Sequence, residues 1–148
     1  MTNSFKVLDP DYETKARASF TSQGIMRLLG ATMRNVAPGR CIIDLPFNEN
    51  LTQQDGFFHA GATSTIADSA GGYAALTLMP AGSRNLTVEF KINLVAPASG
   101  DRLSAEATVV KPGKTLTVST IDVFAYSGDN RKLCAIMQQT AICIPQSG

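Results

Sequence analysis

Histidine and cysteine are scarce in this chain of 148 residues, which has one histidine and three cysteines. The single His59 and the scattered Cys41, Cys134 and Cys143 do not form a tetrahedral zinc set at any usual spacing. An odd number of separated thiols also argues against a disulfide scaffold. The cysteines are therefore expected to be small core residues in a reducing compartment, and no metal site is predicted.

Net charge is also nearly absent, because thirteen Lys and Arg side chains are balanced by twelve Asp and Glu side chains. This balance gives no electrostatic case for nucleic acid or an anionic membrane as partner, although a local patch could still bind a phosphate-bearing small ligand. The N-terminus lacks the features of a secretory signal, so we expect a cytoplasmic protein. The least charged stretch, residues 56–83, is too polar to span a membrane.

The motifs of several enzyme classes are missing, namely G-x-S-x-G, the P-loop, H-E-x-x-H and G-x-G-x-x-G. Serine hydrolases, nucleotide hydrolases, zincins and Rossmann enzymes therefore have no support. The length of the chain and its 44% hydrophobic content predict one compact domain over residues 1–148. Any active site must be built from this domain or from copies of it.

Residues 1–30 are predicted to form a helical cover. Asp9 is suited to be an N-cap and Pro10 to occupy the first helical position, so a short helix is expected over 10–20. A second helical segment over 22–29 is ended by a glycine. These segments precede the rest of the fold.

The following pattern predicts a two-stranded hairpin, a long helix and four further strands. Pro38-Gly39 separates the strands of the hairpin. Residues 59–79 lack strand alternation and are rich in alanine, which predicts one central helix roughly 30 Å long. Because this helix is apolar nearly all round, it is expected to be buried. The later strands are expected over 86–95, 102–111, 114–126 and 132–144.

The strand over 86–95 has the cleanest alternation in the sequence. Apolar residues from Leu86 to Leu94 alternate with a polar set that includes Thr87, which predicts a strand. Antiparallel connections on both sides of one helix predict an α+β domain, in which a single antiparallel sheet wraps the central helix.

Asp68 is the only carboxylate between Asp55 and Arg84, in the middle of the predicted helix. It is either a functional carboxylate in a cleft or a buried aspartate bonded to backbone, Thr or Ser, and the residues leave both readings open. His59 cannot pair with it within one chain, because nine helical positions amount to about 180° of rotation and roughly 13 Å of rise. We expect the His59 ring to bond to a loop carbonyl at the helix start.

Ala60 and Gly61 fall in the first turn of this helix, where backbone N–H groups lack helical partners and the dipole is positive. This end of the helix is a possible oxyanion site. Gln53 and Gln54 lie in the loop before this helix. Loop glutamines are ordinarily solvated, and the spacing of these two gives no reason to assign them a function. A local cationic patch for phosphate, or merely a soluble surface, is expected from Arg84, Lys111 and Lys114.

The run from Gln53 to Gly61, with Asp68 seven residues after Gly61, resembles the loop and central helix of hotdog-fold acyl-CoA thioesterases of the phenylacetic-acid-degradation (PaaI-like) type. The family motif is H-G-G followed by an Asp at this spacing, and Ala60 here replaces the middle glycine. The likeness extends over about residues 30–145, through Thr87–Ala98, Gly100-Asp101 and Gly113–Leu116.

The resemblance implies a hotdog fold and a homodimer with each active site between subunits, the dimers pairing into a homotetramer. It implies that the Ala60 N–H polarises the thioester carbonyl, which alanine can do where φ is negative. Gln53 would hold the carbonyl or the attacking water. The partner subunit's Asp68 would act as general base or nucleophile, and Thr87 would orient water or the carboxylate. Because the start of one helix can face the middle of the other, His59 would belong to the same catalytic site as that Asp68.

The resemblance also implies the reaction, hydrolysis of a small-to-medium or aryl acyl-CoA to the free acid and CoA. Thioesters are activated, so a carboxylate and an oxyanion site suffice without metal or cofactor. Gly61 and Phe58 are expected to contact the substrate. The CoA phosphates would be held by Arg84, Lys111 and Lys114. The acyl group would enter an apolar slot near Phe57, Phe58 and Tyr73.

Two alternatives stay open beside this interpretation. One is a non-catalytic hotdog protein that binds acyl-CoA or serves only in assembly, which the replacement of glycine by Ala60 keeps open. The other is a hydratase-type hotdog enzyme, although those sites use a histidine base in a different local pattern.

Overall fold

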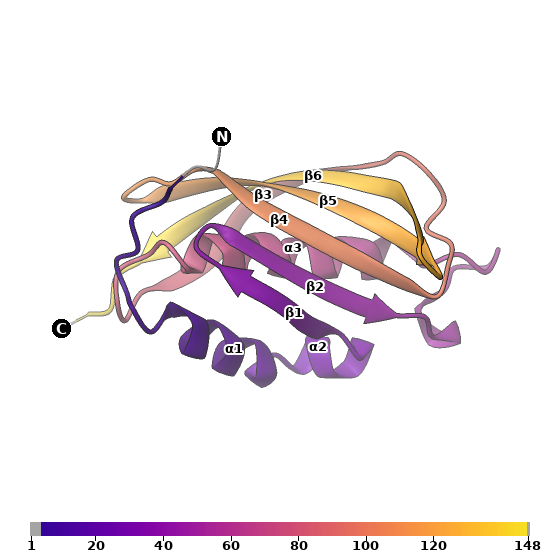
Figure 1. Ribbon diagram of the computed structural model, residues 1–148, viewed down its shortest axis with the longest axis horizontal. Helices are drawn as coiled ribbons and strands as arrows, with labels where there is room; N and C mark the ends of the chain where they lie inside the picture. Colours follow the sequence, from indigo (N-terminus) through magenta and orange to yellow (C-terminus); the bar gives the residue numbers. More distant parts are fainter. Residues whose placement is uncertain (1–3, 148) are drawn as a thin grey trace.

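A computed structural model describes residues 4–147 of the chain (Figure 1). One antiparallel sheet of six strands, in the order β1-β2-β4-β5-β6-β3, wraps around the long helix α3. The predicted α+β arrangement is thus confirmed. The helices are α1 (Tyr12–Ser22), α2 (Gly24–Leu29) and α3 (Ala60–Leu76), with a 3-10 turn η1 (Glu49–Leu51) before α3. The strands are β1 (Thr32–Ala37), β2 (Arg40–Pro46), β3 (Arg84–Leu94), β4 (Arg102–Lys111), β5 (Leu116–Ser127) and β6 (Asn130–Ile144).

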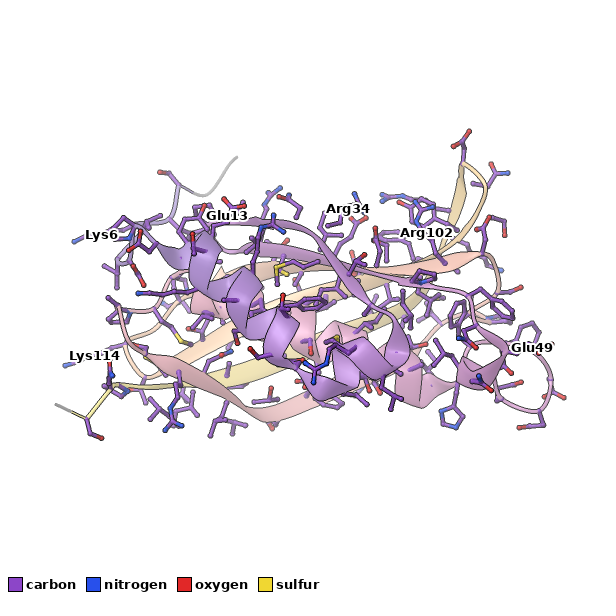
Figure 2. The ribbon with its side chains drawn as sticks, turned by 90° about the horizontal axis from the view of Figure 1, so that it is seen from below. Lys6, Glu13, Arg34, Glu49, Arg102 and Lys114 are labelled. Atoms are coloured by element: carbon purple, nitrogen blue, oxygen red, sulfur yellow. The ribbon has the colours of Figure 1, made fainter. Side chains whose placement is uncertain are left out.

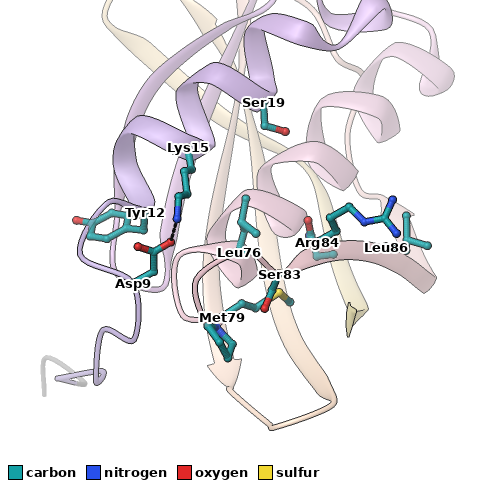
Figure 3. A pocket seen from close by; sticks show the side chains of 12 residues that line it. Asp9, Tyr12, Lys15, Ser19, Leu76, Met79, Ser83, Arg84 and Leu86 are labelled. Carbon is teal, nitrogen blue, oxygen red and sulfur yellow. Dashed lines mark hydrogen bonds and ion pairs between the residues drawn. The ribbon is translucent and has the colours of Figure 1, made fainter. Parts of the chain in front are cut away.

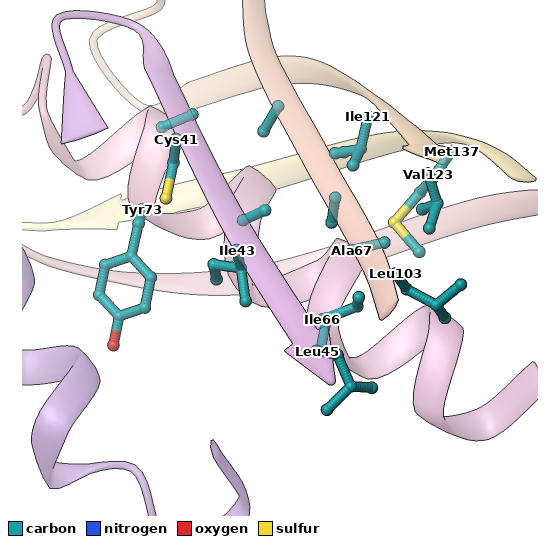
Figure 4. Packing of buried hydrophobic residues seen from close by; sticks show 14 of the residues in the cluster. Cys41, Ile43, Leu45, Ile66, Ala67, Tyr73, Leu103, Ile121, Val123 and Met137 are labelled. Carbon is teal, nitrogen blue, oxygen red and sulfur yellow. The ribbon is translucent and has the colours of Figure 1, made fainter. Parts of the chain in front are cut away.

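Helix α3 is the centre of the hydrophobic core. Its small residues Ala67, Ala70 and Ala74 are completely buried, which allows the strands to approach the helix closely. Figure 4 shows Ile66 of α3 packing among side chains of the surrounding strands. The helix begins at Ala60, one residue after the predicted start, and ends at Leu76, three residues before the predicted end. No helix among residues 4–147 is long and apolar enough to cross a membrane.

The N-terminal cover consists of α1 and α2, although residues 1–3 of the predicted segment lie outside the described residues. Helix α1 begins at Tyr12, two residues later than predicted, with Asp11 at the N-cap position. Asp9 still stabilises this start, because its carboxylate accepts hydrogen bonds from Lys15 Nζ (2.5 Å) and from the Asp11 N–H (3.0 Å). Both bonds lower the pKa of Asp9, and the bond from Lys15 has the larger effect. Helix α2 ends at Gly30 with a φ of 77°, as predicted.

The predicted hairpin is β1 and β2, and Gly39 between them has a φ of 70° that favours glycine. The four later strands also occur in the predicted order. Only β4 has the predicted bounds at both ends, while the other three differ by one or two residues. Because β4, β5 and β6 separate β2 from β3, the hairpin and β3 form the two sides of the sheet.

Strand β3 contains a β-bulge that changes which side chains face α3. Thr87 pairs with Ala141 and Glu89 pairs with Thr140, so Val88 is an extra residue in β3. Paired residues lie on the same face of a sheet, and Ala141 is buried against the helix layer. Thr87 therefore points toward α3. The predicted strand is confirmed, but the bulge reverses its alternation partway, so the apolar residues from Leu86 to Leu94 do not all lie on one face.

Candidate active site

Asp68 lies in the middle of α3, partly buried, where the helix passes under β6 and β3. Its Oδ1 accepts hydrogen bonds from Thr87 Oγ1 (2.7 Å) and from Gln139 Nε2 (2.6 Å). Within residues 4–147 no hydrogen bond engages Asp68 Oδ2. The structural interpretation of Asp68 is confirmed, because it bonds to a threonine of the sheet. A catalytic role for the carboxylate stays a prediction.

Asp68 lines a pocket of about 230 Å³ together with Thr87 and residues of the N-terminal cover. The Tyr73 hydroxyl lies 3.1 Å from Ser19 Oγ and accepts a hydrogen bond of 2.9 Å from Gln23 Nε2. Burial raises the pKa of Tyr73, and the bonds to Ser19 and Gln23 oppose this rise. The N-terminal cover thus supplies a polar wall to the pocket of Asp68.

His59 is the N-cap of α3, with extended backbone angles of φ −64° and ψ 141°. Its Nδ1 accepts a hydrogen bond of 2.7 Å from the Gly61 N–H. The expected bond from the ring to a loop carbonyl is therefore wrong, because the ring satisfies a free N–H of the helix instead. As a result, the Gly61 N–H is already occupied.

Ala60 is the first residue of α3, and it is exposed. The N–H groups of Ala62 and Thr63 both bond to the His59 carbonyl, whereas none of the described residues accepts a bond from the Ala60 N–H. No residue other than glycine in the described part of the chain has a positive φ. Ala60 therefore meets the condition under which alanine can replace glycine, and its N–H is the free donor of the first turn.

A second pocket, of about 500 Å³, lies at the start of α3. Gln53, Phe57, Phe58 and Ala60 line it, together with residues 94–98, which comprise the last residue of β3 and the segment after it. The Gln53 side chain accepts hydrogen bonds from the backbone N–H groups of Asp55 and Phe57. The structure thus brings the predicted loop glutamine and the helix start together.

Within one chain the two pockets are separate. Asp68, Thr87 and Tyr73 line the first, while Phe57 and Phe58 line the second. The expected apolar slot shared by Phe57, Phe58 and Tyr73 therefore does not form in a single chain. The slot does not form because α3 is long and separates the loop before the helix from the later turns of the helix, where Tyr73 lies.

The three predicted cations do not lie beside Ala60 in one chain. Arg84, at the start of β3, lines a pocket of about 370 Å³ with the Asp9–Lys15 ion pair (Figure 3). Lys111 ends β4 and Lys114 follows it. Figure 2 shows Lys114 at the opposite end of the molecule from Glu49, whose 3-10 turn precedes α3. A role for these three cations in binding phosphate stays a prediction.

The sequence did not reveal Gln139. It points inward from β6 between Met137 and Ala141, and its side chain is almost completely buried, at 1% exposure. A polar residue at an inward position of an alternating strand is the one signal that could have found it. The described residues 4–147 contain no group of three or more His, Cys, Asp or Glu side chains that could hold a metal ion.

Comparisons with known proteins identify the family of this chain. The profile of the thioesterase superfamily matches residues 55–132. Acyl-coenzyme A thioesterase 13 of Homo sapiens is 30% identical over 109 residues, covering 72% of this chain and 77% of the relative. The crystal structure of a thioesterase family protein from Silicibacter pomeroyi has a TM-score of 0.89 at 44% identity, over 91% of this chain and 99% of that chain. The E. coli PaaI protein of the phenylacetic acid degradation operon shares the fold, with a TM-score of 0.83 at 20% identity, over 95% and 98% of the two chains.

Proposed function

The chain belongs to the thioesterase superfamily and has its hotdog fold, and on this basis we propose that it hydrolyses a small-to-medium or aryl acyl-CoA to the free acid and CoA. The observation that carries the proposal is the pair of half-sites. One holds a carboxylate, Asp68, with a free oxygen, and the other holds the free Ala60 N–H at a helix start. Together they provide the base and the oxyanion donor that thioester hydrolysis needs.

The active unit in this proposal is a homodimer formed through β3. This strand lies at the edge of the sheet and exposes large apolar side chains, among them Leu86 (58%), Val88 (55%) and Leu94 (56%). An open, apolar edge strand is a template for pairing with another strand. A two-fold axis pairs β3 with its own copy in antiparallel orientation. The pairing of dimers into a homotetramer stays a prediction.

Antiparallel pairing brings the two half-sites together. Thr87, with the Asp68 of the same chain bonded to it, lies near the start of β3. The pocket of Ala60 is lined by residues 94–98, at and just after the end of β3. The start of one β3 then lies beside the end of the other. In the dimer, Ala60 and Gln53 thus face the partner subunit's Asp68, which resolves their separation within one chain.

The same pairing changes the assignment of the cations. Arg84 is the first residue of β3, so it approaches the partner's pocket and is the candidate for binding a CoA phosphate. Lys111 and Lys114 are separated from β3 by β5 and β6. Lys111 and Lys114 would therefore attract the CoA phosphates only weakly, from a greater distance.

In the proposed mechanism, the thioester oxygen accepts a hydrogen bond from the Ala60 N–H, and the Gln53 amide orients the carbonyl or the water. Oδ2 of the partner subunit's Asp68 takes a proton from water as the water oxygen bonds to the carbonyl carbon. The tetrahedral intermediate then collapses, the C–S bond breaks, and the CoA sulfur leaves with the proton. Thr87 holds Asp68 Oδ1 throughout, and Phe58 and Gly61 line the substrate site beside Ala60.

Release of free CoA thiol from a panel of acyl-CoA thioesters, varied in chain length and including aryl acyl groups, tests this proposal. We expect turnover of at least one member of the panel. Binding of acyl-CoA without release of thiol would favour the non-catalytic alternative. The hydratase alternative needs a histidine base, and here the His59 Nδ1 is engaged as the helix cap.

A further inference from the structure

Two side chains donate hydrogen bonds to the proposed catalytic carboxylate, and Gln139 is the more buried of the two. Its Nε2 donates to Asp68 Oδ1 (2.6 Å) and to the Asp68 backbone carbonyl (2.7 Å). An amide nitrogen has two protons, and these two short bonds use them, whereas the contact of the same nitrogen with Thr87 Oγ1 is longer, at 3.4 Å. The amide is therefore tied at once to the carboxylate and to the helix backbone that carries it.

The orientation of this amide is determined by its partners. A carbonyl and a carboxylate both accept hydrogen bonds, so only the nitrogen of Gln139 can face them. Its Oε1 is left buried without a partner among the described residues. Gly71 makes room for this oxygen, since a Cβ at position 71 would collide with it. An unpaired buried oxygen disfavours folding, so stability alone does not account for a glutamine at this position.

We propose that Gln139 is a positioning residue, which with Thr87 fixes Asp68 Oδ1 and thereby selects Oδ2 as the oxygen that receives the proton from water. Two donors on one oxygen define the plane of the carboxylate, which otherwise rotates freely about its last bond. The bond from Gln139 to the Asp68 backbone keeps the amide from moving with the carboxylate. This inference rests on the proposed function, in which Asp68 is the base.

The test compares Gln139→Met with Gln138→Met, using the complete chain and an acyl-CoA that the wild type hydrolyses. Methionine keeps the length of the side chain and removes both donors. We expect kcat to fall about tenfold or more with KM changed less than about twofold, since the substrate contacts are untouched. Gln138 is exposed on the opposite face of β6, and its variant should keep the wild-type kcat. In an Asp68→Asn background, Gln139→Met should lower the residual kcat no further.

A wild-type kcat in folded Gln139→Met would overturn the inference. It would also be overturned if Gln139→Met lowered kcat by the same factor in the Asp68→Asn background as in the wild type. If Gln139→Met does not fold, Gly71→Ala serves instead, because its methyl group displaces the amide while alanine favours the helix. An unchanged kcat in folded Gly71→Ala would likewise overturn it.

A readout without turnover separates this inference from the proposed function. If the wild type releases no CoA, the proposed function fails, and crystal structures of the wild type and Gln139→Met still report the carboxylate. The inference expects the Asp68 carboxylate to rotate in the variant. The same carboxylate orientation in both structures would contradict it.

Discussion

The hydroxyl of Thr87 donates a 2.7 Å hydrogen bond to Oδ1 of Asp68, 19 residues earlier in the chain. This contact depends on the bulge at Val88, because a regular strand with the alternation of Phe90 would point Thr87 away from α3. An irregularity in the edge strand thus contributes directly to the geometry of the proposed base.

Asp68→Asn should abolish most of the turnover while leaving the fold intact. Asparagine keeps an oxygen that can accept the bonds from Thr87 and Gln139, but it cannot take a proton from water. We expect kcat to fall by about 10²- to 10⁴-fold, the usual contribution of a general base. Steady-state release of CoA measures this, with the thermal unfolding midpoint as control for folding. Retention of the wild-type kcat in the folded variant would show that Asp68 is not the base.

Thr87→Val should lower kcat by roughly tenfold, because it removes one of the two donors to Asp68 Oδ1 and keeps the shape of the side chain. Thr87→Ser, which keeps the hydroxyl, should restore most of the rate. The matched control is Thr120→Val, on the exposed face of β5. Equal rates for the Val and Ser variants at position 87 would argue against a role for the hydroxyl.

Ala60→Pro removes the proposed oxyanion donor with little expected effect on the helix. Proline is favoured at the first helical position, and the extended backbone of His59 suits a residue that precedes proline. Loss of one such donor costs about 2.7–4 kcal/mol in activation free energy, so kcat should fall by about 10²- to 10³-fold. Ala60→Gly keeps the N–H and should stay active. If the proline variant folds and keeps its rate, the oxyanion donor lies elsewhere.

The buried cysteines make the fold sensitive to alkaline pH. Burial raises the pKa of Cys41 from 9.0 to about 12 and that of Cys134 to about 11. Above pH 9 the unfolded chain therefore releases protons that the folded chain retains, so stability is lost as the pH rises. From pH 8 to 10 the two thiols should together lower the free energy of unfolding by about 2–3 kcal/mol.

Urea unfolding at both pH values, for the wild type and for the double variant Cys41→Ala and Cys134→Ala, measures this effect. Between pH 8 and pH 10, the free energy of unfolding should fall by about 2–3 kcal/mol less in the double variant than in the wild type. Equal losses in the two proteins would show that the thiols are not the cause.

The sequence predicted the elements whose pattern is local. Alanine-rich composition without alternation identified α3, and Pro38-Gly39 identified the first hairpin, because helix and turn preferences act within a few residues. The family motif also located Asp68 and Ala60. These features depend on the chain near each residue.

The remaining features depend on contacts between distant segments. The bulge at Val88 belongs to the pairing of β3 with β6, so the alternation along β3 does not reveal that Thr87 points toward α3. The bond from Gln139 to Asp68 spans 71 residues and has no local signal beyond a polar side chain in an inward position. The separation of Phe58 from Tyr73 follows from the length of α3.

A heterodimer of the Ala60→Pro and Asp68→Asn subunits tests the central claim, that each active site combines Ala60 of one subunit with Asp68 of the other. Co-expression with two different affinity tags allows the heterodimer to be purified, and both homodimers should be nearly inactive. In a shared site, one of the two sites of the heterodimer receives both intact residues and the other receives neither. We predict that its kcat recovers to about half of the wild-type value per dimer. A purified heterodimer as inactive as its two parents would contradict the account.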